Sequence, residues 1–555
     1  MGAHSATASA PRAPEHGAGE DRARRRAAAG YLPWGLLAAV VGVAVWLLVD
    51  PRTPDLAAQV YRADLFGEAG WTVWDARWYG GHDIPGYSLV FPPLAALLGV
   101  RTVGALAVLV SAALFERLAR VAYGAAARWG AVWFALAALG DVWSGRITFA
   151  LGVSFALAAV AALALSRARV APVATVALAA LSAACSPVAG ALLVLAGVTH
   201  SLARRSWRSA ALLGIAPALV IAVLVGCFAE GGWEPYPLLS FLATGAALGG
   251  FLIAVLALAP AEGGLLRLGA AVYLAVCVAC VALHTPMGAN VERYGVLLAG
   301  PLLLCALLDS GSRGAAAVVA SAALLGIGLW TVWGPVRETA AVAGEASTSA
   351  AYYAPVERFV AGHGGSRVRI EVPFTRGHWE AAWLARRVSL ARGWEKQLDE
   401  RYDGVLLSGR LTAERYYRWL REQAVSYVAL PDAPLDPSSA DEGRVIESDP
   451  GYLREVLRTR HWRIYAVRDA TPLASGPGAL SALGRDWFTL RARTGGRFVV
   501  RVHYTRYWTV TAGAACVTSA PGGWTAVSAR AAGTVRVAAR FSLGRALGLG
   551  GQSCT

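Results

Sequence analysis

The chain has 555 residues, of which 56% are hydrophobic, and a formal net charge of +15. Its mean hydropathy of +0.47 excludes an ordinary soluble protein, and its length exceeds that of one domain, so we expect a membrane part and a soluble part. The basic charge is almost entirely arginine, with Lys396 the only lysine. No nucleic-acid-binding motif accompanies it, so we expect no nucleic-acid partner.

The first apolar run follows a polar, arginine-containing start. Residues 1–30 are rich in Ala, Gly and Arg and are predicted to form a disordered cytoplasmic tail. The run over 31–49 resembles a signal peptide because Arg24–Arg26 precedes it. It is long enough to cross the hydrocarbon layer, and no small-residue cleavage site follows before Asp50. We therefore interpret it as an uncleaved first membrane span.

Further apolar runs of spanning length follow, and together they predict a polytopic membrane helix bundle over 31–335 with about eleven spans. The runs are 31–49, 102–121, 129–140, 147–165, 170–185, 187–199, 209–227, 239–258, 268–283, 294–308 and 314–333.

Arginines in the connecting segments predict the orientation of the bundle. The side that holds the amino terminus carries Arg12, Arg22, Arg24, Arg25, Arg26, Arg117, Arg120, Arg128, Arg167, Arg169, Arg204, Arg205, Arg208, Arg267 and Arg313. The opposite side carries only Arg52, Arg62, Arg77, Arg101, Arg146 and Arg293. Cytoplasmic loops are enriched in Arg and Lys, so we expect a multi-pass protein of the cell membrane with a cytoplasmic amino terminus. An odd number of spans then makes the carboxy-terminal region extracytoplasmic.

Polar residues of the outer loops are the candidate site. Charges near hydrocarbon are costly, so their gathering on one face predicts a shared aqueous cavity; the alternative is that outer loops are simply polar. The segment 284–294 could form a polar clamp, or a helix amino-terminal cap with an internal Glu292–Arg293 pair. The candidates in these loops are Asp55, Asp75, His82, Asp141, Arg146, Glu234, His284, Asn290 and Arg293.

The composition changes after Trp333. Strand-like stretches at 367–374, 427–430 and 462–467 and helix-like stretches at 379–390 and 413–423 predict an α/β domain over 345–475. Alternation over 498–504 and 534–541 predicts a β-sandwich in a β-rich domain over 476–555.

Two further features belong to this soluble region. Two polar clusters, one from Thr375 to Glu380 with His378 and one from Arg392 to Asp399 with Trp394, combine aromatic rings with carboxylates and arginines. Such clusters suit sugar rings and phosphates, and Trp394 is the candidate for substrate binding, unless they form a salt-bridged surface that packs on the membrane domain. Cys516 and Cys554 could pair if the region is exported, whereas the other cysteines lie in apolar runs as small hydrophobic residues.

The chain resembles the GT-C membrane glycosyltransferases, and among them an actinobacterial branch. The resemblance rests on Asp55 shortly after the first span and a helix-like stretch over 55–66. Trp74-Asp75, Gly80-Gly81 and the stretch from Pro85 to Leu94 continue it, and Asp141 matches the second acidic position. The Asp-Glu dipeptide that some branches carry in this first loop is absent from residues 50–100. The resemblance implies transfer of a sugar from a polyprenyl-phosphate donor to an envelope glycan, lipid or protein acceptor on the outer membrane face.

Such a reaction assigns roles to the candidates. Asp55 is the expected base or orienting carboxylate, with Asp141 as the second catalytic acid, although Asp55 could instead cap the next helix. Arg146, Arg293 and His284 are expected at the leaving phosphate. The resemblance establishes no cofactor, since some members of the class need none; Asp55 and Asp141 are candidate ligands of a divalent cation, Mg²⁺ or Mn²⁺.

Two other functions stay open at this point. A multi-pass secondary transporter would also place polar residues between apolar helices, although no internal duplication is visible in the sequence. A non-catalytic cell-envelope membrane protein would keep the same fold without the chemistry.

Overall fold

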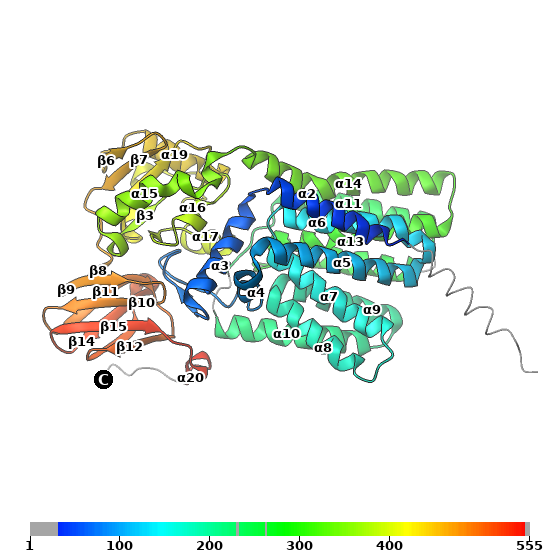
Figure 1. Cartoon of the computed structure of the whole chain (residues 1–555), viewed down its shortest axis with the longest axis horizontal. Coiled ribbons are helices and arrows are strands. Elements are labelled where there is room, and N and C mark those ends of the chain that lie inside the picture. The colour runs from blue at the N-terminus through cyan, green and yellow to red at the C-terminus, as the bar shows by residue number, and fades with distance from the viewer. Residues whose placement is uncertain (1–31, 229–231, 261–262, 550–555) are drawn as a thin grey trace, which may run out of the picture.

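The computed structural model describes residues 32–228, 232–260 and 263–549. The predicted disordered tail over 1–30 and the pairing of Cys516 with Cys554 involve residues outside these ranges, so both stay predictions. Within the described ranges a bundle of helices is followed by two smaller β-containing units (Figure 1). This arrangement confirms the predicted fold class.

Eleven apolar helices make up the bundle in the described part of the chain, one for each predicted apolar run. They are α2 (Trp34–Val49), α5 (Val100–Tyr123), α6 (Ala127–Trp143), α7 (Ile147–Leu165), α8 (Ala171–Cys185), α9 (Pro187–Arg204), α10 (Arg208–Cys227), α11 (Leu238–Leu258), α12 (Gly263–Ala282), α13 (Glu292–Ser310) and α14 (Ala315–Val342). Small residues allow close approach, since a Cβ at Gly130 of α6 would lie 2.2 Å from the Cys305 Sγ of α13.

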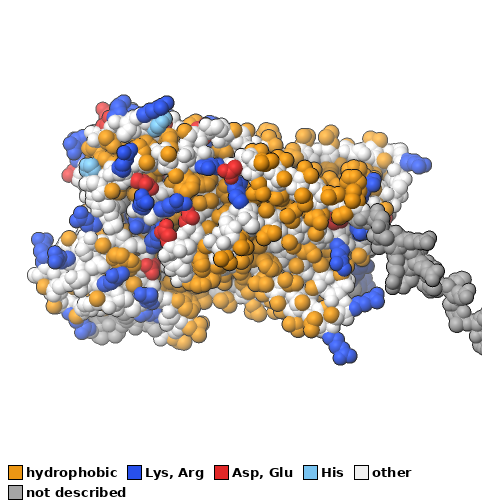
Figure 2. All heavy atoms as spheres, in the orientation of Figure 1, with side chains coloured by type: hydrophobic (Ala, Val, Ile, Leu, Met, Phe, Trp, Pro, Cys, Tyr) orange, Lys and Arg blue, Asp and Glu red, His pale blue; other side chains and the backbone are white. Residues whose placement is uncertain are grey.

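Many of these helices are long and apolar enough to cross a membrane. Among the described residues eight stretches meet this condition, with Val100–Trp143 counted once although it contains both α5 and α6, which pack together. The helix α8 is apolar but shorter, and α2 forms a bent pair with α3 (Pro54–Ala69) at 82°. Hydrophobic side chains cover the visible face of the bundle (Figure 2). The chain is therefore a multi-pass membrane protein.

The segment after α2 lies between the bundle and both soluble units (Figure 1). The helix predicted over 55–66 is confirmed as α3. It is followed by a hairpin and a short helix: β1 (Trp74–Asp75), β2 (His82–Asp83) and α4 (Phe91–Leu98). The Trp78 indole donates to the Ala381 carbonyl at 2.9 Å, and the His503 amide donates to the Gly80 carbonyl at 2.8 Å. The hairpin region thus joins the bundle to both soluble units.

The first soluble unit has a five-stranded mixed sheet with the order β4-β3-β5-β7-β6. Its elements are α15 (Ala350–Gly362), β3 (Arg369–Glu371), α16 (Glu380–Trp383), β4 (Ser389–Leu390), α17 (Lys396–Tyr402), α18 (Ala413–Glu422), β5 (Val425–Pro431), α19 (Ala440–Glu447), β6 (Leu453–Arg458) and β7 (Trp462–Val467). The helix predicted over 379–390 is wrong beyond its first turn, because the chain leaves α16 to add β4 beside β3.

The second soluble unit is a sandwich of two four-stranded antiparallel sheets, with the orders β12-β15-β10-β9 and β13-β14-β11-β8. Its strands are β8 (Ala474–Ser475), β9 (Gly478–Leu483), β10 (Trp487–Ala492), β11 (Gly496–His503), β12 (Trp508–Ala512), β13 (Ala515–Ser519), β14 (Trp524–Ala529) and β15 (Gly533–Ala539), followed by the short helix α20 (Leu543–Ala546). Alternate side chains such as Phe488, Leu490 and Phe498 are buried between the sheets, as strand periodicity requires.

Candidate active site

A cavity of 1230 Å³ lies where the helix ends of the bundle meet the α/β unit. One wall comes from bundle helices and α3, and the facing wall comes from residues 374–400 and 436–438. Seven of the ten residues predicted for the site line it. They are Asp55, Asp141, Arg146, Glu234, Asn290, Arg293 and Trp394.

Arg146 joins three separate elements at this cavity. Its Nε lies 3.2 Å from the Asp55 Oδ2 of α3, and its Nη2 lies 3.2 Å from the Glu338 Oε1 of α14. The three side chains are between 20% and 34% exposed, so each keeps contact with solvent in the cavity. A partly solvated ion pair of this kind fixes orientation more than it adds stability. The cluster therefore holds the Asp55 carboxylate at a defined place on the cavity wall.

Local sequence explains how Asp55 and Arg146 meet. Thr53 is the N-cap of α3 and Pro54 occupies the first helical position, which its fixed φ favours. The expectation that Asp55 caps this helix is wrong, because Asp55 lies inside the first turn. A carboxylate there interacts favourably with the helix dipole. Before Arg146 the chain turns at Gly145 (φ +84°), where a Cβ would lie 2.3 Å from the Leu56 nitrogen.

Asp141 and Arg293 flank this cluster. Asp141 lies in the last turn of α6 rather than in a loop, because α6 continues to Trp143, and its side chain is buried. Arg293 begins α13, with its Cζ 5.1 Å from the ring centroid of Phe149. No described carboxylate lies within ion-pair distance of Arg293. The predicted Glu292–Arg293 pair is therefore not formed, and the Arg293 guanidinium is open to an anion.

Glu234 and Asn290 are brought together where the segment before α11 packs on the short 3₁₀ turn η2 (Gly288–Val291). The Glu234 amide donates to the Thr285 carbonyl at 3.0 Å, and the Ala289 amide donates to the Pro235 carbonyl at 3.4 Å. Burial raises the pKa of Glu234 to about 7. A carboxyl group with such a pKa can both give and accept a proton near neutral pH.

Three predicted residues do not line the cavity. Asp75 is fully buried in the hairpin and accepts a hydrogen bond from the Tyr61 hydroxyl at 2.5 Å. His82 is buried beside it, and burial lowers the pKa of His82 to about 3, so the ring is neutral at physiological pH. Neither residue lines the cavity, so their predicted substrate contact stays a prediction that this geometry does not support. The exposed His284 packs on Trp233, with ring centroids 4.7 Å apart, outside the lining.

Some lining residues were missed from the sequence. Glu338 was overlooked because the last span was ended at 335, whereas α14 continues to Val342. Asp436 was also missed, because it lies far in sequence from His378 of the predicted polar cluster, and only the fold of the α/β unit brings the His378 Nε2 to 3.5 Å from the Asp436 Oδ2. The sequence signal that could have indicated Glu338 is the charged dipeptide Arg337-Glu338 shortly after the last apolar run.

The side chains around Asp55 and Asp141 bear on the predicted metal site. Among the described residues no group of three or more His, Cys, Asp and Glu side chains could hold a metal ion. Asp55 is already paired with the cationic Arg146, which opposes a second positive charge at the same oxygen atoms. The residues therefore do not fit a cation held by Asp55 and Asp141 alone.

Comparison with known proteins gives distant likenesses only. No family model and no curated protein matches the chain. The cryo-EM structure of the arabinofuranosyltransferase AftD from Mycobacteria aligns with a TM-score of 0.47 and 15% identity, covering 92% of this chain and 57% of that one. A structure of its R1389S mutant aligns with a TM-score of 0.47 and 16% identity, covering 91% and 60%. The chain thus spans less than two thirds of these proteins, and likeness at this level assigns no activity.

Proposed function

We propose that the chain is a membrane glycosyltransferase. It moves a hexosyl or pentosyl group from a polyprenyl-phosphate donor to a glycan, lipid or protein acceptor of the cell envelope. The observation that carries the proposal is the cavity at the end of the bundle, where the Asp55–Arg146–Glu338 cluster faces Asp141 and the unpaired Arg293. This set supplies a carboxylate for a hydroxyl group and a cation for a phosphate within one solvated space.

An apolar side of the same cavity suits the lipid chain of such a donor. Val225 of α10, Leu239 of α11 and Trp333 of α14 line the cavity, yet they are 59%, 82% and 66% exposed. The helix α10 packs on α8 and α9, whereas α11 packs on α12, α13 and α14. A polyprenyl chain lying between these helix groups would remain in an apolar environment while its phosphate entered the cavity.

The proposed transfer step forms one bond at the anomeric carbon and breaks another. The acceptor hydroxyl oxygen forms a bond to the anomeric carbon as the bond from that carbon to the phosphate oxygen breaks. Asp55 takes the hydroxyl proton, and polyprenyl phosphate leaves. Arg293 stabilises the charge that develops on the leaving phosphate, while Arg146, already engaged with two carboxylates, orients Asp55.

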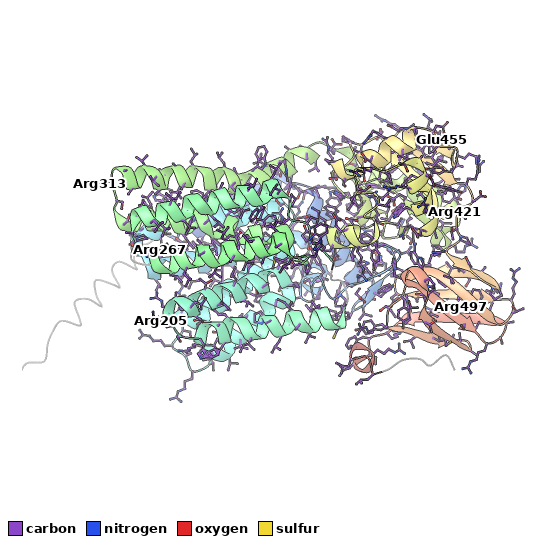
Figure 3. All side chains as sticks on the ribbon, turned by 180° about the vertical axis from the view of Figure 1, so that it is seen from behind. Arg205, Arg267, Arg313, Arg421, Glu455 and Arg497 are labelled. Atoms are coloured by element: carbon purple, nitrogen blue, oxygen red, sulfur yellow. The ribbon has the colours of Figure 1, made fainter. Side chains whose placement is uncertain are left out.

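Arginine placement supports an outward-facing site. Arg205, Arg267 and Arg313 lie at the end of the bundle away from the soluble units (Figure 3). By the positive-inside rule that end is cytoplasmic, so the cavity and both soluble units face the outside of the membrane. Lipid-linked sugars and envelope acceptors would meet there.

A transporter is less consistent with the same geometry. Transporter sites form near the bilayer midplane, at discontinuous helices between repeats. Here the charged lining residues lie at helix ends: Asp55 in the first turn of α3, Asp141 in the last turn of α6 and Glu338 near the end of α14. The soluble α/β unit also forms one wall of the cavity, which suits a reaction at the membrane surface.

The test is transfer by the full chain in nanodiscs. Short-chain polyprenyl phosphates carrying tritiated arabinosyl, mannosyl or glucosyl groups would be supplied with envelope extracts as acceptors. We expect transfer from one of these donors, and Asp55→Asn should reduce it about 10²–10⁴-fold, the usual contribution of a general base. The matched control is Asp64→Asn on the same helix, since Asp64 pairs with Arg386 away from the lining. Full activity of Asp55→Asn would remove this mechanism.

A further inference from the structure

The cavity wall formed by the α/β unit carries an aromatic surface that the proposed transfer step does not use. The rings of His378 and Trp394 are stacked, with centroids 3.4 Å apart and planes at 15°. Phe374 packs edge-on against His378 at 4.7 Å. All three residues line the cavity, and Trp394 remains partly exposed. We refer to His378 and Trp394 together as the aromatic platform.

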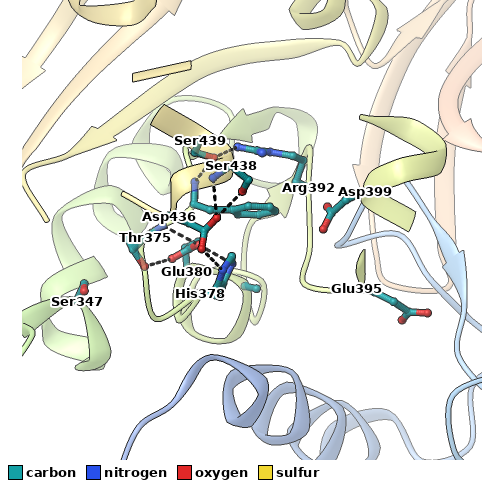
Figure 4. Close-up of polar contacts among 12 residues, drawn as sticks. Ser347, Thr375, His378, Glu380, Arg392, Glu395, Asp399, Asp436, Ser438 and Ser439 are labelled. Carbon is teal, nitrogen blue, oxygen red and sulfur yellow. Dashed lines mark hydrogen bonds and ion pairs between the residues drawn. The ribbon is translucent and has the colours of Figure 1, made fainter. Parts of the chain in front are cut away.

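Asp436 and Ser438 lie beside His378 of this platform (Figure 4). The Asp436 Oδ1 accepts hydrogen bonds from the Ser438 amide at 2.8 Å and from the Ser438 hydroxyl at 2.6 Å. Burial alone would raise the pKa of Asp436, but the hydrogen bonds from His378 and Ser438 hold that pKa well below its usual range. Asp436 is therefore an ionised acceptor, and its side chain is 29% exposed at the cavity.

His378 combines a strained backbone with a buried ring atom that lacks a hydrogen-bond partner. Its φ is +54°, although it is not glycine, and its side chain is only 1% exposed. Its Nδ1 has no hydrogen-bond partner, since the Glu380 Oε1 lies 3.9 Å away. Backbone strain and an unpaired buried polar atom each cost free energy and occur together mainly at binding sites.

The cations of the cavity gather on one wall, although both walls carry carboxylates. Arg146, Arg293 and Arg337 on the bundle wall are three of the four Arg and Lys residues among the described lining residues, and the α/β wall contributes only Lys396. The acidic lining residues are Asp55, Asp141, Glu234, Glu292 and Glu338 on the bundle wall and Glu395, Asp399, Glu400 and Asp436 on the α/β wall. A donor phosphate is therefore favoured at the bundle wall. The α/β wall instead offers an aromatic face with hydrogen-bond acceptors at its edge, which suits an uncharged, hydroxyl-rich ring whose C–H face packs on the aromatic rings.

We infer that the aromatic platform, with Asp436 and Ser438, is the subsite for the acceptor, and that the acceptor is a neutral saccharide. This inference rests on the proposed function. A sugar ring of the acceptor stacks on Trp394, and its hydroxyl groups donate to Asp436. The acceptor hydroxyl then reaches across the cavity toward Asp55, while the donor occupies the opposite wall.

The experiment measures steady-state kinetics of the full chain in nanodiscs with arabinosyl, mannosyl and glucosyl tetrasaccharides as acceptors. We expect Trp394→Ala and Ser438→Ala to raise the acceptor KM, the first by at least 10-fold, and to leave the donor KM within about 2-fold. Trp71→Ala is the matched control, because Trp71 is 67% exposed and does not line the cavity. An unchanged acceptor KM in Trp394→Ala, or an equal rise in the donor KM, would overturn the inference.

A direct binding measurement separates this inference from the proposed transfer. The same tetrasaccharides would be titrated against the nanodisc protein without donor, with saturation-transfer NMR as the readout. Binding by the wild type that is weakened at least 10-fold in Trp394→Ala supports the subsite even if no sugar is transferred. Equal binding by the two proteins, or binding of no tetrasaccharide, would overturn it even if transfer is observed.

Discussion

Two parts of the segment after the first span look alike in sequence and differ in position. The start of α3 carries Asp55, and the hairpin carries Asp75 and His82; both parts combine acids with aromatic neighbours. Asp55 is 34% exposed at the cavity and pairs with Arg146, whereas Asp75 is fully buried beneath the soluble units. Polar residues near a membrane surface can therefore either face a cavity or hold domains together, and their position relative to the cavity distinguishes the two.

A matched pair of arginines tests this difference most strongly. Arg146→Met should reduce transfer about 10²–10³-fold, because Asp55 would lose the cation that orients it. The melting temperature should change little, since these side chains are partly solvated. Arg77→Met in the hairpin should lower the melting temperature and leave transfer per folded molecule nearly unchanged. Arg77 donates to the Arg387 carbonyl at 2.9 Å and does not line the cavity. Similar losses of transfer per folded molecule in both variants would contradict the distinction.

The buried carboxyl of the hairpin provides the second test. Asp75→Ala should lower the free energy of unfolding by about 1–3 kcal/mol, because the Tyr61 hydroxyl and the Arg77 amide would lose their acceptor. Transfer per folded molecule should stay within about 2-fold of wild type. Thermal unfolding followed by fluorescence and transfer assays on the same preparation measure both. Asp75→Asn, which keeps an acceptor oxygen, should cost less; a large drop in kcat for Asp75→Asn would return this residue to the chemistry.

The same contrast explains what could be predicted from sequence. Apolar runs predict the bundle helices because hydrocarbon thickness sets their length, and the predicted outer face brings Asp55, Asp141 and Arg293 to one cavity. Neither pattern indicates where the soluble units dock, so the burial of Asp75 could not be foreseen. The contact of Glu338 with Arg146 depends on how far α14 continues past its apolar run, which hydropathy does not define.

The variant Arg293→Gln tests donor binding separately from acceptor binding. Arg293→Gln should raise the donor KM about 10-fold, as expected for the loss of one charge-assisted hydrogen bond, and should leave the acceptor KM unchanged. The melting temperature should hardly move, because no described carboxylate pairs with this guanidinium. Donor titrations at two salt concentrations measure the effect, and the wild type should show the stronger salt dependence. An acceptor KM that rises with the donor KM would mean that the two substrates are not held on separate walls.

A pH dependence of stability, rather than of transfer, is expected from Glu234 on the cavity wall. Burial raises the pKa of Glu234 to about 7 in the folded chain, above its ordinary value near 4.5. Between these pH values the unfolded chain loses a proton that the folded chain keeps. Wild-type stability should therefore fall relative to Glu234→Gln as pH rises from about 4.5 to 7, and the difference should stay constant above that.

Its size should be about 3 kcal/mol, because each tenfold change of the ionisation constant between 4.5 and about 7 contributes about 1.4 kcal/mol. Melting temperatures of both proteins across this range measure the difference, with Glu422→Gln at an exposed position as the matched control. Parallel curves for wild type and Glu234→Gln would mean that Glu234 is solvated like an ordinary surface carboxylate. Water would then reach Glu234, in the segment before α11, more freely than its burial implies. Another carboxylate of the lining would have to exchange protons near neutral pH.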